Sequence, residues 1–232
     1  MSIEENLNRI RERIAAAAGR AGRDPEQITL VAVSKTKNAD MVRQALAAGQ
    51  LEFGENYLQE AAVKIPQLPD ECRWHCIGHI QSNKARLAAE IFDVVETVDR
   101  LKIALALERH LAAIGKIMPV YIQVNIGREP QKAGVMPEEA AVLAREVTAC
   151  AHLRLSGLMA IPPHSQEAEK SRAYFRALRE LGAELSNTPS PGVSLGLSMG
   201  MSGDFETAIE EGATLVRVGT AIFGGRSLKK RL

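Results

Sequence analysis

The segment Thr29-Leu30-Val31-Ala32-Val33-Ser34-Lys35 joins an apolar, partly β-branched run to a hydroxyl group and an amine. Such a run predicts a buried strand, here over residues 29–34. Residues 39–48 follow with the periodicity of a helix, so the two segments form one strand–helix unit. The same unit recurs along the chain and decides the fold class.

Seven further segments have strand character and alternate with segments of helical periodicity. Because alternating strands and helices form right-handed βαβ units, they predict a parallel α/β sheet. Eight units predict closure into a single TIM (β/α)8 barrel, with residues 1–232 as one domain. The predicted strands after the first are 51–54, 73–77, 94–98, 120–124, 153–158, 193–197 and 214–218. The helical segments between them include 39–48, 101–114, 137–149 and 166–185.

One more helix precedes the first strand. Ser2 with Glu5 forms a capping-box pattern at its start. Ile3, Leu7 and Ile10 then recur at helical spacing. We therefore expect an extra N-terminal helix in addition to the eight units.

Composition and charge limit the classes of function. The 232 residues carry 29 basic and 28 acidic side chains, a net charge of +1, whereas a nucleic-acid binder usually has a basic excess. No stretch approaches the ~18 consecutive apolar residues of a membrane span, and the charged first helix does not have the pattern of a signal peptide. The three cysteines, Cys72, Cys76 and Cys150, favour a reducing compartment over a disulfide framework. The sequence thus predicts a cytoplasmic protein with no nucleic-acid or membrane partner.

The residue at the end of the first strand is the first candidate for chemistry. Active sites of such barrels lie at the carboxyl ends of the strands, and Lys35 follows the first apolar run. Desolvation lowers the pKa of a buried amine toward neutrality, which makes the amine a nucleophile for carbonyl carbons. The alternative is a lysine that simply emerges into solvent, as most lysines do.

Two glycine-containing turns are candidates for binding a phosphate group. Leu197-Ser198-Met199-Gly200-Met201-Ser202-Gly203-Asp204 ends the seventh predicted strand, and Gly219-Thr220 follows the eighth. Barrels often bind phosphate through these two loops, by main-chain N–H groups and the helix dipole. The alternative is that the glycines only form tight turns. A strand-end lysine and a phosphate site together indicate a phosphorylated aldehyde as the ligand.

Four further residues in or after the predicted strands have open roles. Arg217 lies between two valines, so it faces either the barrel interior, where a pyridine nitrogen is a suitable acceptor, or a helix carboxylate outside. Asn56 follows the second strand and either binds a ligand or caps the next helix. His75 and Cys76 lack a second ligand cluster at zinc-site spacing, so we expect strand packing there and no metal.

Eight blocks of sequence, taken in order, identify a family resemblance. Three of them are Val33-Ser34-Lys35-Thr36-Lys37, Phe53-Gly54-Glu55-Asn56-Tyr57 and His75-Cys76-Ile77-Gly78-His79-Ile80-Gln81-Ser82-Asn83-Lys84, and the others lie at residues 124–125, 132–134, 157–159, 197–205 and 216–224. Over nearly the whole chain this order and spacing resemble the pyridoxal phosphate homeostasis proteins, relatives of the alanine racemase barrel domain. The resemblance implies a fold-type III barrel that binds pyridoxal 5′-phosphate (PLP).

The resemblance also implies roles for the candidate residues. Lys35 holds PLP as a Schiff base, Arg217 faces the pyridine nitrogen, and Asn56 lies near the ring. The implied phosphate cradle consists of Ser198, Met199, Ser202, Gly219 and Thr220. The family is regarded as a regulator of free cofactor and amino-acid levels without established turnover, so we expect no catalytic residue.

Two enzymatic alternatives to a carrier stay open. A racemase needs a second base on the opposite face of the cofactor, and the resemblance implies that racemases take it from an added C-terminal domain or a partner subunit. Here the chain ends eight residues after Gly224, and we expect that domain to be absent and the protein to be a monomer. None of Tyr57, Tyr121 and Tyr174 is an obvious substitute. A class I aldolase usually has its lysine on a later strand, and residues 159–161 offer none.

As a carrier, the protein would deliver PLP to apo-enzymes. Lys37 and Lys132 are the other amines considered for holding the aldehyde or helping its transfer. The sequence does not decide whether the basic Lys229-Lys230-Arg231 run takes part.

Overall fold

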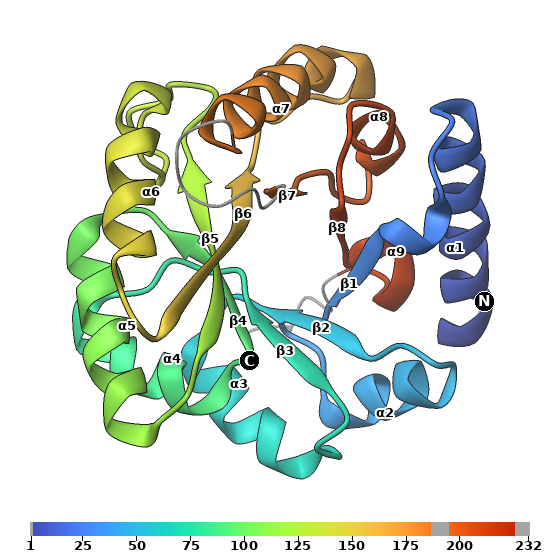
Figure 1. Ribbon diagram of the computed structural model, residues 1–232. Coiled ribbons are helices and arrows are strands. Elements are labelled where there is room, and N and C mark those ends of the chain that lie inside the picture. The colour runs from blue at the N-terminus through green and yellow to red at the C-terminus, as the bar shows by residue number, and fades with distance from the viewer. Residues whose placement is uncertain (1, 187–194, 226–232) are drawn as a thin grey trace.

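Eight parallel strands close into a barrel in chain order, β1 to β8, with β8 beside β1 (Figure 1). The structure, a computed structural model, describes residues 2–186 and 195–225. The predicted TIM barrel is confirmed. The strands are β1 (Thr29–Val33), β2 (Glu52–Glu55), β3 (Arg73–Cys76), β4 (Val94–Val98), β5 (Met118–Val124), β6 (Leu153–Ala160), β7 (Gly196–Ser198) and β8 (Leu215–Val218).

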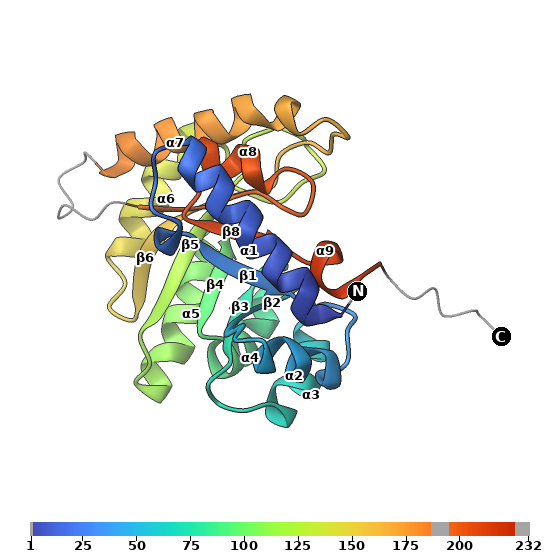
Figure 2. The same cartoon turned by 90° about the vertical axis from the view of Figure 1, so that its right-hand side faces the viewer.

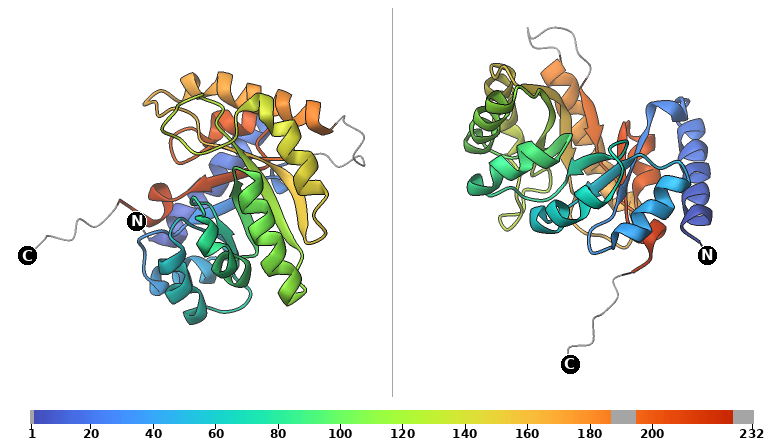
Figure 3. Two further views of the ribbon diagram at one scale, coloured as in Figure 1. Left: turned by 90° about the vertical axis from the view of Figure 1, so that its left-hand side faces the viewer. Right: turned by 90° about the horizontal axis from the view of Figure 1, so that it is seen from below.

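Helices surround the barrel on the outside, as the side view and the view from below show (Figure 3). The α-helices are α1 (Ile3–Arg20), α2 (Ala39–Ala47), α3 (Leu58–Lys64), α4 (Ala85–Ile91), α5 (Leu101–Ile114), α6 (Ala140–Thr148), α7 (Arg172–Ser186), α8 (Phe205–Glu210) and α9 (Thr220–Phe223). Short 3-10 helices are η1 (Pro25–Gln27), η2 (Ile65–Gln67), η3 (Ser82–Lys84), η4 (Pro137–Glu139) and η5 (Ala168–Ser171). None of the helices in the described ranges combines the length and apolar composition needed to cross a membrane.

The predicted extra helix is α1, and its capping box is present. Ser2 Oγ accepts the Glu5 N–H at 3.1 Å, and Glu5 accepts the Ser2 N–H at 2.7 Å. At about 1.5 Å per residue, α8 and α9 are too short to cover the strands beside them. Helix α1 crosses outside β1 and contacts both short helices, so it completes the outer layer (Figure 2).

Five strands end at different residues from those predicted: β1, β2, β3 and β7 differ by one residue and β6 by two. Strand β6 continues to Ala160, two residues beyond the predicted end, and stays paired with β5 through Val124. Strand β7 spans only Gly196–Ser198, and residues 193 and 194 of the prediction lie outside the described residues. These shifts decide which side chains can reach the carboxyl end of the barrel.

Candidate functional site

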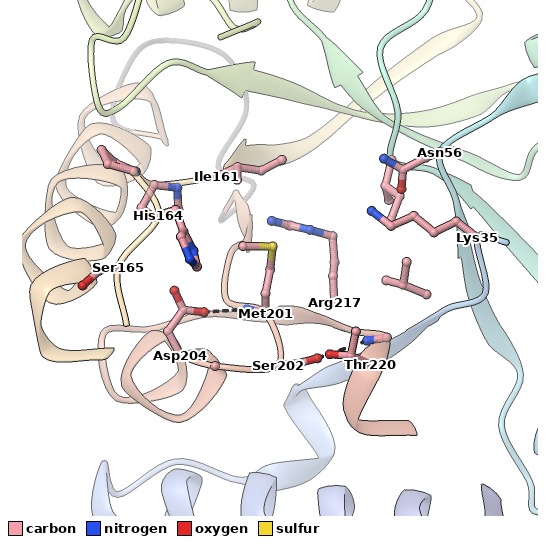
Figure 4. A pocket seen from close by; sticks show the side chains of 16 residues that line it. Lys35, Asn56, Ile161, His164, Ser165, Met201, Ser202, Asp204, Arg217 and Thr220 are labelled. Atoms are coloured by element: carbon pink, nitrogen blue, oxygen red, sulfur yellow. Dashed lines mark hydrogen bonds between the residues drawn. The ribbon is translucent and has the colours of Figure 1, made fainter. Parts of the chain in front are cut away.

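A cavity of about 270 Å³ opens at the carboxyl end of the barrel (Figure 4). The loops after β1, β2, β3, β6, β7 and β8 line it. Six of the eight predicted site residues meet there: Lys35, Asn56, Ser202, Arg217, Gly219 and Thr220. The strand-end rule therefore brought the amine and most of the phosphate cradle to one cavity.

The loop that carries Lys35 is fixed on both sides of the lysine. Thr36, a β-branched residue, has a left-handed backbone with φ of 63°, which is strained and persists only where contacts enforce it. Its N–H donates to Glu60 Oε1 at 2.7 Å, and Lys64 Nζ donates to the Ser34 carbonyl at 2.9 Å. These two contacts leave the backbone at Lys35 little freedom to turn the side chain out of the cavity.

Asn56 brings an unsatisfied group to the cavity. Its Oδ1 is buried and accepts no hydrogen bond from any described residue. The Asn56 backbone is tightly packed as well, because a Cβ atom at Gly78 would lie 2.0 Å from its carbonyl oxygen. A buried acceptor without a donor costs roughly 1–3 kcal/mol. The carboxamide is thus held in place with a hydrogen-bonding position left for a ligand.

The turns after β7 and β8 present donors to the same cavity. Within residues 2–186 and 195–225, the main-chain N–H groups of Ser202, Gly203 and Thr220 donate to no acceptor. The hydroxyl groups of Ser202 and Thr220 lie beside them, and Ser202 Oγ accepts the Gly219 N–H at 3.4 Å. Asp204 closes the first turn by accepting the Met201 N–H at 2.7 Å. Clustered amides and hydroxyls are the donor set that binds a phosphate group.

Arg217 points into the barrel. Its Nη2 donates to the Ala160 carbonyl at 2.9 Å, and its Nη1 donates to Ser198 Oγ and lies 3.7 Å from Glu96 Oε2. The outward alternative, with a helix carboxylate as partner, is therefore wrong. A guanidinium has five N–H donors, so these acceptors leave some of them for the cavity that Arg217 also lines.

Comparison with known proteins identifies the family. Residues 5–227 match the family model described as alanine racemase, N-terminal domain. A pyridoxal phosphate homeostasis protein of Pseudomonas aeruginosa is 50% identical over 97% of this chain and 96% of its own length. This chain belongs to the pyridoxal phosphate homeostasis protein family. A relative of that name from Escherichia coli K12 is 46% identical over 99% of both chains.

Solved structures agree with this family. The structure of PipY from Synechococcus elongatus PCC7942 with PLP bound is 37% identical, with a TM-score of 0.83. The structure of the same protein without PLP has a TM-score of 0.86. Both comparisons cover 96% of this chain and all of PipY. The fold and the family thus agree along nearly the whole length.

Two predicted site residues of this family member do not line the cavity. Ser198 is still within β7, so its side chain lies in the barrel interior with Glu96 and Arg217. The Met199 side chain is fully buried, and its N–H donates to the Leu215 carbonyl at 3.1 Å. Neither side chain contributes to the cradle wall, and the Met199 amide already has an acceptor.

Several lining residues were not predicted as site residues. The segment Ile161–Ser165 follows β6, and Met201, Gly203 and Asp204 flank Ser202. Ile77 also contributes. In the close-up, His164 and Asp204 stand at the opposite end of the cavity from Lys35 and Asn56 (Figure 4). The strand-end rule applied to β6 would have found residues 161–165 if the end of that strand had been placed at Ala160.

The other two amines considered for holding the aldehyde, Lys37 and Lys132, do not line the cavity and have partners of their own. Lys37 Nζ donates to the carbonyls of Phe223, Gly224 and Gly225 at 2.8 to 3.0 Å, at the end of α9. Lys132 pairs with Glu129 and donates to the Pro162 carbonyl at 3.0 Å. The basic run at residues 229–231 lies outside the described residues.

The structure gives His75 and Cys76 a different role from metal binding. In the described part of the chain, no group of three or more His, Cys, Asp or Glu side chains is arranged to hold a metal ion. His75 instead lies between Glu52 and Glu96 inside the barrel. Burial raises the pKa of the Cys76 thiol to about 12, which keeps it protonated at neutral pH.

Proposed function

We propose that the protein binds PLP as a Schiff base on Lys35 and acts in intracellular PLP homeostasis without turnover. The observation that carries the proposal is one cavity holding an amine on one wall and unsatisfied phosphate donors on another. An aldehyde condenses with an amine, and a phosphate group binds to amides and hydroxyls. PLP has both groups in one small molecule.

The residues present fit the chemistry of this cofactor. The Ser202–Gly203 turn and Thr220 would hold the phosphate group, and the Asn56 carboxamide would pair with a polar substituent of the ring. Arg217 would face the pyridine nitrogen. When bound, PLP supplies an electron sink for amino-acid chemistry. Because Arg217 does not readily give up its proton, it would leave the pyridine nitrogen unprotonated and weaken that sink.

A carrier role agrees with this arrangement and with the names of the relatives. The recipients would be apo-enzymes that need PLP, and we expect a cytoplasmic monomer. Since a carrier must also release its cargo, the reversible bond to Lys35 suits the role. The polar contacts at Ser202, Thr220 and Asn56 would then set the affinity, and no group in the cavity would need to act on a substrate.

A racemase is the second candidate function, because two titratable groups line the cavity away from Lys35. His164 and Asp204 lie at its opposite end (Figure 4). Racemisation needs a second proton acceptor, and either side chain has the chemistry for it. Incubating the PLP-loaded protein with single-enantiomer amino acids in deuterated water tests this. Efficient α-proton exchange that is lost in Lys35→Ala would replace the carrier role by an enzymatic one.

Replacing Lys35 is the direct test of the proposed function. We expect Lys35→Ala to abolish the near-ultraviolet to violet absorbance of bound PLP and to leave no lysine modified after borohydride reduction and peptide mapping. Circular dichroism should be unchanged, because Lys35 lies beyond the end of β1. Lys132→Ala is the matched control and should keep the absorbance. Modification of Lys37 or Lys132 in the Lys35→Ala protein would contradict the assignment.

A further inference from the structure

A row of alternating charges crosses the barrel interior beneath the cavity. Glu52 on β2 accepts from His75 Nε2 at 2.7 Å, and Glu96 on β4 accepts from His75 Nδ1 at 2.6 Å. Since both ring nitrogens face carboxylate oxygens, both must donate, and the ring is an imidazolium. The row starts in a second cavity of about 220 Å³ that Glu52 and His75 line near the N-terminal ends of the strands.

The far end of this row is Arg217. Glu96 uses one oxygen for His75 and the other for Ser198, whose Oγ lies 2.5 Å away, and Arg217 lies 3.7 Å from that second oxygen. The side chains of His75, Glu96 and Arg217 are 4%, 0% and 3% exposed. The buried charges therefore alternate in sign from Glu52 to Arg217, and only Arg217 reaches the cavity with Lys35.

We propose that His75 is a positioning residue for the cofactor pocket: held as an imidazolium between Glu52 and Glu96, it fixes Glu96 so that the second oxygen of Glu96 keeps Arg217 and Ser198 in place. This inference rests on the proposed function only in taking Arg217 to face the ligand. The contacts that connect Glu52, His75, Glu96 and Arg217 do not depend on the proposed function.

The charge state of the row follows from its surroundings. Burial alone would lower the pKa of His75, but its bonds to Glu52 and Glu96 outweigh burial and raise the pKa to about 9. Burial, the largest single influence, would raise the pKa of Glu96, but its interactions with His75, Arg217 and Ser198 together outweigh burial and leave the pKa below its usual value. The charged and titratable groups that face the row are Glu52, Arg73, Tyr121 and Arg154, which line the second cavity with His75, and Arg217, which lies beside Glu96.

Removing the imidazolium changes what Glu96 can hold. A glutamine at position 75 carries no charge, and because its carbonyl oxygen can only accept, it does not reproduce the two opposed N–H donors of the ring. Glu96 would then lose its fixed partner on one oxygen while Arg217 still attracts it, and the carboxylate would reorient. Charges interact strongly where water is excluded, so this change reaches Arg217 without any direct contact to His75.

The test compares His75→Gln with His152→Gln in the ¹⁵N-labelled full chain. His152 forms a similar bond with Glu108, at 2.9 Å, but near the surface and away from Arg217. The arginine side-chain signals are recorded without added cofactor, and the Arg217 signal is assigned by its loss in Arg217→Lys. We expect His75→Gln to shift the Arg217 signal and His152→Gln to leave it in place. The wild-type Arg217 signal should also move as His75 loses its proton near pH 9, and this step should be missing in His75→Gln.

A second measurement connects the row to the ligand. The PLP dissociation constant should rise about two- to thirty-fold in His75→Gln, the size expected for a mutation that acts through a network, and should stay unchanged in His152→Gln. Unchanged Arg217 signals in a folded His75→Gln protein would overturn the inference whether or not PLP binds. If His75→Gln does not fold, wild-type Arg217 signals that stay constant while His75 titrates would do the same. Failure of the wild-type protein to bind PLP would instead overturn the proposed function.

Discussion

The two ends of the barrel differ in how their polar groups are satisfied. At the carboxyl end, Asn56 Oδ1 and the amides of the Ser202–Gly203 turn have no partner among residues 2–186 and 195–225. Toward the N-terminal end, Glu52, His75 and Glu96 satisfy one another at 2.6 to 2.7 Å. A buried polar group without a partner persists only where something offsets its cost. The unsatisfied groups therefore mark where a ligand can bind, and the satisfied row supports that region from inside the barrel.

The largest effect on stability is expected from a mutation that interrupts the row of paired charges from Glu52 to Arg217. Glu96→Gln removes the negative charge between His75 and Arg217, which leaves the buried Arg217 without a carboxylate and His75 with Glu52 alone, and should lower the free energy of unfolding by about 3 to 5 kcal/mol. Urea denaturation measures the loss. Glu108→Gln, in the partly exposed pair with His152, should cost at most about 1 kcal/mol. Equal losses of unfolding free energy in Glu96→Gln and Glu108→Gln would show that the buried pair contributes no more to stability than the partly exposed one.

The pH dependence of stability tests the same row without a mutation in Glu96. The folded-state pKa of His75 is raised to about 9 from its ordinary value of 6.5. The folded protein therefore binds the proton more tightly, and the stabilisation is complete below pH 6.5 and lost as the pH rises through 9. The difference in unfolding free energy between wild type and His75→Gln should shrink across this window. A constant difference between pH 6 and pH 9.5 would show that His75 is not an imidazolium.

Gly78→Ala acts at the open end through packing. The added Cβ would lie 2.0 Å from the Asn56 carbonyl oxygen, so the backbone that positions the Asn56 side chain must move. We expect a loss of about 1 to 3 kcal/mol in stability together with weaker PLP retention. Gly19→Ala is the control, because its Cβ meets nothing within 4 Å. If Gly78→Ala bound PLP with wild-type affinity, the position of Asn56 would not matter for PLP binding.

The smallest effect on the fold is expected from Asn56→Ala. Because Asn56 Oδ1 is buried without a partner among the described residues, its removal should cost the fold no stability and should relieve part of the roughly 1–3 kcal/mol that an unsatisfied acceptor costs. PLP affinity should fall roughly tenfold, the value of one hydrogen bond to a ligand. Asn6→Ala is the reciprocal control, since Asn6 Nδ2 donates to the Ile222 carbonyl at 2.9 Å. It should lose stability and keep its PLP affinity.

The bounds of a strand or helix were predicted well where hydrophobic periodicity and the residues that end the element indicate the same bounds. Strand β4 and helix α5 have the predicted bounds. The helix ends where Gly115 adopts a left-handed backbone with φ of 65°. The end of β7 was less predictable, because close backbone approach decides it. A Cβ at Gly157 would lie 2.1 Å from the Gly196 carbonyl oxygen, so position 157 needs glycine for the contact between β6 and β7.

Site residues were predictable where a position directly after a strand is enough to place a side chain at the cavity. Lys35, Asn56, Gly219 and Thr220 all directly follow strands that were placed within a residue or two. Ser198 was assigned to the wrong layer because β7 still includes it. Alternation along β8 gives Arg217 two possible faces and does not choose between them. Its partners Glu96 and Ser198 come from β4 and β7, and only the closed barrel brings these strands to it.

Closure of the barrel also fixes when a ligand can bind. Strand β1 pairs with β8 from Thr29↔Leu215 to Ala32↔Val218, and this seam joins segments from opposite ends of the described chain. Lys35 lies just past one side of the seam and Thr220 just past the other. Contacts between such distant segments close the longest loop and cost the most chain entropy, so we expect them to form late in folding. An incompletely folded chain would thus present the amine without its anion-binding partner, and capture of PLP would report that the last strand has docked.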